Sequence, residues 1–207
     1  MFTDRTDAGE RLAQALVASH LESPLVLALP RGGLPIGRVV ASVLSADLDV
    51  LIVRKIGAPH NPEFAIGAVG EGGVVVLDAA SIEQLGISPV IRDRLIIEAT
   101  AEIDRRVDAY RGGRSIQDLS GHTAVIVDDG LATGATAEAA ARVVRALGAA
   151  RVVLAVPTGS RQAVDRLSSV CDDVVCLETP EWFVSVGSQY VDFPQVTDTE
   201  VVAILHE

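Results

Sequence analysis

The stretch from Val125 to Thr136 reads V-I-V-D-D-G-L-A-T-G-A-T and decides the fold of the chain. Three β-branched residues lead into two carboxylates and a loop of small residues, and the Ala-rich run 137–147 follows until Gly148. This order predicts a strand, a loop and a helix. A loop of small residues at a helix start can bind a phosphate through its amides and the helix dipole. Asp128 and Asp129 can accept hydrogen bonds from two hydroxyls, so the stretch predicts a site for a sugar phosphate.

The pattern V-I-V-D-D-x-x-x-T-G-x-T resembles the ribose-phosphate signature of the type I phosphoribosyltransferases. The resemblance implies that Asp128 and Asp129 hold the ribose 2′ and 3′ hydroxyls of phosphoribosyl pyrophosphate (PRPP). It also implies that the 5′-phosphate binds to Ala132, Thr133, Gly134, Ala135 and Thr136. Ala135 stands where many members carry a second glycine. The alternative is an ordinary βα unit with acids at its strand end, which leaves the T-G-x-T spacing unexplained.

A second strand, loop and helix lie upstream. The apolar run L-V-L-A-L after Pro24 is too short for a helix and predicts a buried strand, and it ends in Pro30, Arg31, Gly32 and Gly33. Two adjacent glycines allow a ligand to approach the backbone closely. The family resemblance implies that this loop holds the pyrophosphate, with Arg31 as its basic residue. A tight turn with a solvated arginine is the alternative.

The segment from Asp49 to Arg54 predicts one further buried strand, which ends in a basic pair. A cation at a strand end of an open α/β sheet points into the usual ligand crevice. The resemblance implies that a basic residue here contacts pyrophosphate and acts in catalysis, and we favour Lys55 over Arg54. A solvated pair is the alternative.

Gly57 to Gly73 is rich in glycine and proline and predicts a loop or ribbon rather than a helix. In the resembling family the matching region is a mobile loop that closes over PRPP and would exclude water from a reactive sugar cation. His60 and Glu63 are the titratable groups at its tip and are candidates for substrate contact or acid–base chemistry. The segment lacks the family's usual supply of lysine and arginine, which favours PRPP binding over turnover. The tract from Arg54 to Val69 also resembles a subgroup of uncharacterised phosphoribosyltransferase-like proteins.

The remaining elements are predicted from capping signals and periodicity. Asp7 and Glu10 have capping-box spacing and predict a first helix over 8–20, while Ser88-Pro89 opens a long helix that ends before Gly112. Further strands are expected over 74–77, 151–156 and 172–177, and short helices over 160–167 and 200–205. The fold class is therefore α/β, a parallel sheet with helices on both faces. Residues 1–178 form the core and 179–207 a small C-terminal hood, as in the resembling family.

Four of the seven aromatic residues lie between Thr179 and Phe193. Flat rings concentrated in one irregular segment suit a lid over a planar base, so Trp182, Phe183 and Tyr190 are candidates for acceptor binding. The alternative is a plug that packs on the edge of the core. Both acids of the signature are expected on an open edge, where a change to asparagine would barely alter stability.

The composition limits the function classes. The net charge of −11 argues against a general nucleic-acid or anionic-membrane surface, and no apolar run reaches the length of a membrane span. The start lacks the features of a signal peptide, so a cytoplasmic protein is expected. Cys171 and Cys176 are expected to be free thiols. The sequence shows no zinc-type cluster of Cys and His. It leaves open whether the protein forms a homodimer.

The resemblance implies a transferase that moves ribose 5-phosphate from PRPP to a nitrogenous base or another small acceptor and releases pyrophosphate. Mg²⁺ would be the cofactor and would be held mainly through PRPP and water, with no direct protein ligand. The alternative of another class is a module that senses PRPP or a nucleotide without catalysis. A phosphatase or hydrolase using the same phosphate pocket is a weaker alternative.

Overall fold

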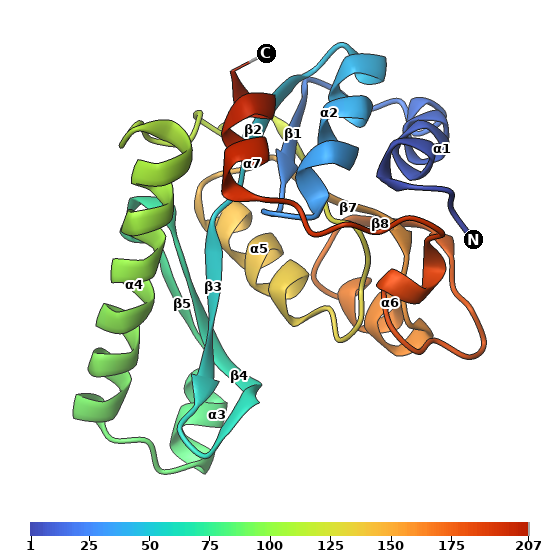
Figure 1. The fold of residues 1–207 in the computed structure, drawn as a ribbon. Helices are drawn as coiled ribbons and strands as arrows, with labels where there is room; N and C mark the ends of the chain where they lie inside the picture. The colour runs from blue at the N-terminus through green and yellow to red at the C-terminus, as the bar shows by residue number, and fades with distance from the viewer. Residues whose placement is uncertain (207) are drawn as a thin grey trace.

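The structure is a computed structural model that describes residues 1–206, without the side chain of Glu63. Its main sheet has five parallel strands in the order β2-β1-β6-β7-β8 (Figure 1). The strands are β1 (Pro24–Ala28), β2 (Asp47–Val50), β6 (Thr123–Val127), β7 (Arg151–Thr158) and β8 (Asp173–Glu178). The parallel sheet predicted from the sequence is confirmed.

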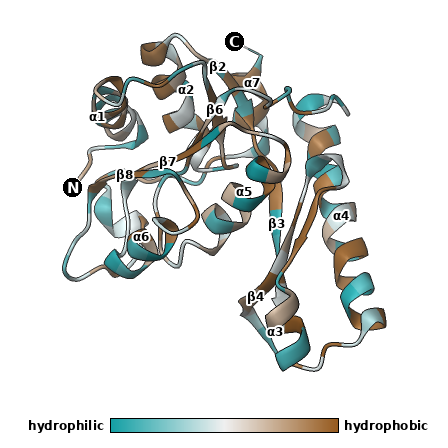
Figure 2. Ribbon diagram, turned by 180° about the vertical axis from the view of Figure 1, so that it is seen from behind, coloured by the Kyte–Doolittle hydropathy of each residue, from teal (hydrophilic) through white to brown (hydrophobic). Residues whose placement is uncertain are grey.

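Helices cover both faces of this sheet. Alternate side chains of β1, β6 and β7 enter two separate cores, one against α1 (Arg5–Val17) and α2 (Gly33–Leu44), the other against α5 (Ala135–Ala146) and α6 (Arg161–Leu167). In Figure 2 the strands of the main sheet are mainly hydrophobic. Strands buried on both faces read as continuous apolar runs, which explains the sequences L-V-L-A and V-I-V.

A second sheet forms an arm that extends away from the main sheet (Figure 1). Its strands β3, β4 and β5 are antiparallel, and the helices α3 and α4 complete the arm. The bounds are β3 (Val53–Ala58), β4 (Asn61–Gly70), the short 3-10 helix η1 (Glu71–Gly73), β5 (Val75–Leu77), α3 (Ala79–Gln84) and α4 (Pro89–Arg111). Ser88 caps α4, Pro89 is its first residue and the helix ends before Gly112, as predicted; Gly112 itself has the left-handed conformation.

The prediction of one strand from Asp49 to Arg54 is wrong. The chain leaves the main sheet after β2 and enters the arm at β3, so Lys55 lies inside a strand rather than at its end. At the break, the Leu51 amide donates to the Ala28 carbonyl at 3.0 Å and the Ile52 amide donates to the Glu71 carboxylate at 2.9 Å. The carboxylate thus takes the hydrogen bond that a continued ladder would have supplied. The segment after Gly57 is a hairpin, in agreement with the ribbon prediction.

A buried ionic cluster joins the arm to the main sheet. Arg111 at the end of α4 pairs with Asp49 of β2, at 3.4 Å, and with Glu71 of η1. Burial raises the pKa of Asp49, although Arg111 opposes that change, and burial lowers the pKa of Arg111. Because removing one partner of such a cluster leaves a buried charge unpaired, the cluster holds the root of the arm in one arrangement.

The N-terminal residues and the tail run together over one end of the main sheet. Phe2 donates from its amide to Gln189 and accepts from Val191, and Thr3 accepts from Asp192, each at 2.8 Å. The tail contains the 3-10 helix η2 (Gly187–Gln189) and ends in α7 (Asp198–Leu205), which packs on α4. Asp4 caps α1, so this helix starts three residues before the predicted position at Ala8, and α7 starts two residues before the predicted Glu200. No helix in residues 1–206 is long and apolar enough to cross a membrane.

Candidate functional site

The signature loop and the glycine pair lie side by side at the carboxyl end of the main sheet. The strands β1 and β6 are neighbours, but the chain continues from β1 towards β2 and from β6 towards β7, on opposite sides. This reversal is the topological switch point where open α/β sheets bind ligands. The Leu29 amide donates to the Val127 carbonyl at 2.8 Å, so the two loops begin in direct contact.

The glycine pair is required for this contact. A Cβ atom added to Gly32 would lie 1.8 Å from Asp129 Oδ2, and one added to Gly33 would lie 2.5 Å from the Val127 carbonyl oxygen and 2.9 Å from the Asp128 Cα. The atoms of the signature that face Gly33 are therefore backbone atoms, which cannot move aside as a flexible side chain could. The peptide bond between Pro30 and Arg31 is cis.

Both helices that start at the switch point begin at a glycine. Gly32 precedes α2 and Gly134 precedes α5, and neither helix has a side-chain cap at this residue. Both helices thus start at the same edge of the sheet, where the two dipoles favour an anion. The first two amides of α2 are already used, since Gly33 donates to the Leu29 carbonyl at 3.1 Å and Leu34 to the Arg31 carbonyl at 3.3 Å. Gly134 has φ +71°, a conformation that glycine adopts without strain.

The phosphate loop is fixed by Ser160, which is the N-cap of α6, and by Arg166 within α6. Ser160 donates from its hydroxyl to the Ala132 carbonyl at 2.8 Å, and Arg166 donates to the Thr133 carbonyl. With these carbonyls occupied, the loop presents its amides and hydroxyls. Ala132, Thr133 and Thr136 are exposed, and Ala135 is half-buried at the first turn of α5.

The two acids of the signature have different surroundings. Asp128 accepts the Asp129 amide at 2.9 Å, and its pKa is raised well above the usual range, mainly by burial and then by the negative charge of Asp129. Burial also raises the pKa of Asp129, while Arg5 opposes that rise. Arg5 donates from Nη2 and Nε to Asp129 Oδ2 at 2.9 and 3.2 Å, and the two side chains are only 9% and 16% exposed.

The expectation that both acids lie on an open edge, where substitution barely alters stability, is therefore wrong for Asp129. This carboxylate is the partner of a buried arginine, and loss of one member leaves the other charge unpaired. Asp128 makes no ion pair with Arg5, so the two acids differ in what they contribute to the ligand-free protein.

A pH dependence of stability follows from the raised pKa of Asp128 and Asp129. Because the folded acids hold protons more strongly than the unfolded acids, the folded state carries more protons between the unfolded pKa near 4 and the raised values. The free energy of unfolding of the ligand-free protein should therefore fall as pH rises above about 4, until the folded acids have lost their protons. Thermal melting of wild type and Asp128→Asn over a series of pH values above about 4 checks this, and the variant should lose part of the dependence. Equal dependence in both proteins would show that Asp128 does not contribute.

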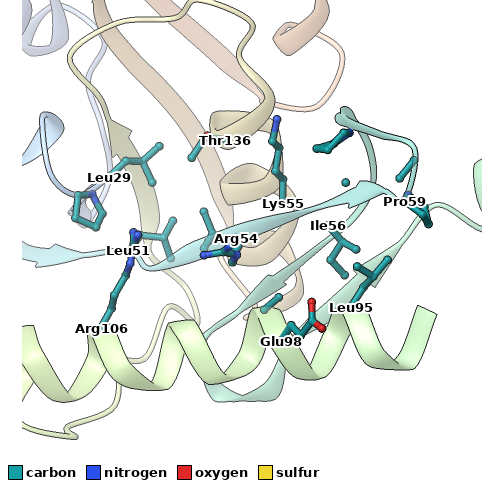
Figure 3. Close-up of a pocket in the computed structure, with 16 residues that line it drawn as sticks. Leu29, Leu51, Arg54, Lys55, Ile56, Pro59, Leu95, Glu98, Arg106 and Thr136 are labelled. Carbon is teal, nitrogen blue, oxygen red and sulfur yellow. The ribbon is translucent and has the colours of Figure 1, made fainter. Parts of the chain in front are cut away.

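A cleft of about 550 Å³ lies beside the switch point. Figure 3 shows Lys55 pointing towards Thr136 at the start of α5, while Ile56 points towards Leu95 of α4. The cleft is therefore bounded by the glycine-pair loop, the phosphate loop, the arm hairpin and α4; its lining includes Leu29, Pro30, Leu51, Lys55, Glu98, Arg106 and Thr136. Lys55 and Thr136 of the phosphate loop thus line the same cleft.

A second cleft of about 370 Å³ lies on the other side of the glycine-pair loop, between the acid pair and the tail. Its walls are Arg5, Arg31, Gly32, Asp129 and the tail residues 193–196. Arg31 also reaches Asp198 of α7 at 3.7 Å. The tail therefore reaches the acid pair.

The aromatic residues of the tail do not act as one group. Tyr190 is 6% exposed, packs on Phe2 and Phe193 at centroid distances of 5.5 and 4.7 Å, and donates from its hydroxyl to the Asp129 carbonyl at 2.7 Å. Its ring is thus a plug on the core, one of the two alternatives. Trp182 is 83% exposed, and Phe183 lines a separate cavity beside Arg161 and Thr179. His60 is exposed at the hairpin tip, and the side chain of Glu63 lies outside the described part of the structure.

Sequence reasoning did not find Arg5 or the role of Tyr190. Arg5 lies in the acidic run T-D-R-T-D and contacts Asp129 across 124 positions. The tail makes its contact with Asp129 across 61 positions. No local pattern signals either contact, because both depend on how the two ends of the chain meet over the sheet.

Comparison with known proteins agrees with this geometry. The family model "Phosphoribosyl transferase domain" matches residues 3–193. The Putative phosphoribosyl transferase Rv0571c of Mycobacterium tuberculosis (strain ATCC 25618 / H37Rv) is 48% identical over 205 residues, which cover 99% of this chain and 46% of that protein. The chain thus spans about half the length of the curated relatives it matches.

Solved structures show the same fold. The crystal structure of TT1426 from Thermus thermophilus has a TM-score of 0.93 and 46% identity, and the match covers 99% of this chain and 97% of that one. AQ2163 from Aquifex aeolicus, at 12% identity and a TM-score of 0.52, covers 98% of this chain and 85% of its own and shows likeness of fold alone. The family model, the relative and the switch-point geometry agree, and the chain belongs to the phosphoribosyl transferase domain family.

Proposed function

We propose that the protein binds PRPP with Mg²⁺ and transfers its ribose 5-phosphate to a small nitrogenous acceptor with release of pyrophosphate. One observation carries this proposal. Two carboxylates lie at the topological switch point between two helices that both begin at a glycine without a side-chain cap. Such a site offers amide donors for phosphate groups and acceptors for a diol within one short span, which is the chemistry of a phosphorylated ribose.

Each part of the site takes one part of PRPP. The amides and hydroxyls from Ala132 to Thr136 bind the 5′-phosphate, and Asp128 and Asp129 accept from the ribose hydroxyls. The loop of Arg31, Gly32 and Gly33 binds the pyrophosphate beside the start of α2, where the helix dipole favours an anion. Lys55, which points to the side of Thr136 in Figure 3, adds positive charge to the same cleft.

The donor set fits a magnesium ion held mainly by the substrate. No group of three or more His, Cys, Asp or Glu side chains that could hold a metal occurs in the described residues. Mg²⁺ commonly uses substrate phosphates and water in place of a protein cage. When bound through PRPP, the ion would neutralise charge on the departing pyrophosphate. The chain's own residues then bind and orient the ribose and place charge around a developing ribosyl cation.

We place the acceptor in the 370 Å³ cleft beside Asp129, under tail residues 193–196. The acceptor would then approach the ribose from the side opposite the larger cleft. Phe183 lines a different cavity and Trp182 is exposed, so neither residue is placed in the acceptor site here. Tyr190 acts through packing and through its hydrogen bond to Asp129.

Closure of the β3–β4 hairpin over PRPP belongs to the same proposal. The hairpin borders the larger cleft through Lys55, Pro59 and Pro62, so its movement changes the access of water to that cleft. Trypsin cleavage after Lys55 should slow when PRPP and Mg²⁺ are added together, whereas cleavage after the exposed Arg114 should not. Equal rates at both sites with and without PRPP would contradict closure.

A second candidate function, PRPP sensing without turnover, is favoured by one feature. The hairpin carries no lysine or arginine from Gly57 to Gly70, so closure would bring no further cation to the pyrophosphate. Release of pyrophosphate from PRPP across a panel of purines, pyrimidines and primary amines separates the two functions. Acceptor-dependent release supports the transferase, binding of PRPP without release supports the sensor, and absence of both contradicts the two proposals.

A further inference from the structure

Arg5 lies outside the sequence motifs and connects three parts of the site. It is the first residue of α1, and its guanidinium contacts Asp129 through Nε and Nη2. The remaining nitrogen, Nη1, donates to the Pro194 carbonyl at 2.7 Å. The guanidinium also lies 3.8 Å from the centre of the Phe193 ring. All three contacts belong to one side chain that is 9% exposed.

The orientation of the Asp129 carboxylate follows from these contacts. Both hydrogen bonds from Arg5 go to Oδ2, and the same oxygen lies against the Gly32 backbone, where no Cβ could fit. Arg5 and Gly32 therefore enclose Oδ2 from two sides. The carboxylate cannot rotate without losing the ion pair, so Oδ1 is the oxygen left for other donors.

The tail is fixed by the same residue. Tyr190 donates to the Asp129 carbonyl, Phe193 lies under the guanidinium and Pro194 accepts from it. The tail thus contacts the side chain and the main chain of the acid-pair loop at once. A shift of the tail would have to break either the contact of Arg5 with Pro194 or its contact with Asp129.

We propose that Arg5 is a positioning residue for the ribose site, which fixes the Asp129 carboxylate for a hydroxyl and holds the tail in register with it. This inference rests on the proposed function, because it assigns the diol of ribose 5-phosphate to the acid pair. Arg5 acts on the ribose through Asp129, although it also lines the cleft proposed for the acceptor. Without it, the buried Asp129 carboxylate lies beside Asp128 with no counter-charge, and it turns away or takes up a proton.

The test compares two small phosphates by NMR titration. Ribose 5-phosphate offers both phosphate and diol, and methyl phosphate offers the phosphate alone. The ratio of the affinity for ribose 5-phosphate to that for methyl phosphate reports on the diol. A general loosening of the phosphate loop weakens both ligands alike and leaves this ratio unchanged. In Arg5→Gln the ratio should fall about 10-fold from the wild-type value, the loss of one hydrogen bond to a charged group. Arg5→Lys keeps the charge but not the forked geometry of the guanidinium, so its affinity ratio should fall about 3-fold or more from the wild-type value.

Arg11→Gln is the matched control. Arg11 lies on the same helix, stacks over Phe2 at 4.3 Å and pairs with Glu178 at 2.8 Å, but it does not contact the acid pair. Its ratio should equal that of wild type. If Arg5→Gln does not fold, Arg5→Lys decides, and an unchanged ratio in the folded variant overturns the inference. A wild-type ratio near one overturns the proposed ribose site as well, whereas a high ratio kept in both Arg5 variants overturns the role of Arg5 alone.

Discussion

Replacing Asp129 with leucine is expected to lower the free energy of unfolding by about 3 kcal/mol in the absence of any ligand. The reason is the buried guanidinium of Arg5, which would lose its only acidic partner among the ion pairs found in residues 1–206. The value lies at the low end for a broken buried pair, because removing Asp129 also relieves its repulsion of Asp128. For a domain of this size the melting temperature should fall by roughly 6–12 °C.

Two variants serve as controls for this prediction. Asp128→Asn removes the neighbouring charge but leaves the ion pair, so its melting temperature should stay close to that of wild type. Arg5→Met combined with Asp129→Leu removes both charges and should recover part of the loss, since apolar residues often replace a buried pair without cost. A single Asp129→Leu variant that melts like wild type would show that the pair is not buried in solution.

The second large effect is expected at Gly33. An alanine Cβ there would meet the backbone of Val127 and Asp128 at 2.5 and 2.9 Å, so the two loops must separate. Overpacking of this kind costs about 1–3 kcal/mol in stability. Separation of the glycine-pair loop from the acid pair should weaken PRPP binding by roughly 10-fold or more, the loss of at least one hydrogen bond to a charged group. Titration calorimetry with PRPP and Mg²⁺, together with thermal melting, measures both effects.

Gly86→Ala is the control for the loss of a glycine as such. Gly86 has φ +60° and open space around it, and it lies in the arm between α3 and α4. Its substitution should cost about 1 kcal/mol of stability through backbone strain alone and leave PRPP affinity unchanged. If Gly33→Ala binds PRPP as tightly as Gly86→Ala does, the contact between the two loops is not needed for binding.

The local motifs could be predicted from the sequence because their signals are contiguous. The β-branched run before Asp128, the glycine pair after β1 and the Ser88-Pro89 cap each specify a strand end or helix start by themselves. Right-handed connections alone do not fix the adjacency of β1 and β6, because several strand orders satisfy them. The placement of Arg31, Gly32 and Gly33 beside Asp128 and Asp129 was expected from the family resemblance, which assigns both loops to one ligand.

The predictions were wrong where the conformation of a segment depends on residues that are distant in the sequence. The apolar run from Asp49 to Arg54 would suit either sheet, and the break falls where Glu71 accepts from Ile52. Asp4 and Asp7 are both able to cap a helix, and the earlier one does so because its carboxylate accepts from two amides of the first turn. The ion pair of Arg5 and Asp129 is specified by the whole fold, which is why open acids were predicted where one buried pair occurs.

The most direct test of the ribose site is titration calorimetry of wild type and Asp128→Asn with PRPP and Mg²⁺. Asp128 makes no ion pair with Arg5, so its substitution separates ligand binding from stability more cleanly than that of Asp129. A hydrogen bond to a charged group contributes about 1.5–3 kcal/mol, so the variant should bind PRPP roughly 10- to 150-fold more weakly while its affinity for inorganic phosphate stays the same. Equal affinity of both proteins for PRPP would contradict the assignment of the acid pair to the ribose and the transferase proposal with it.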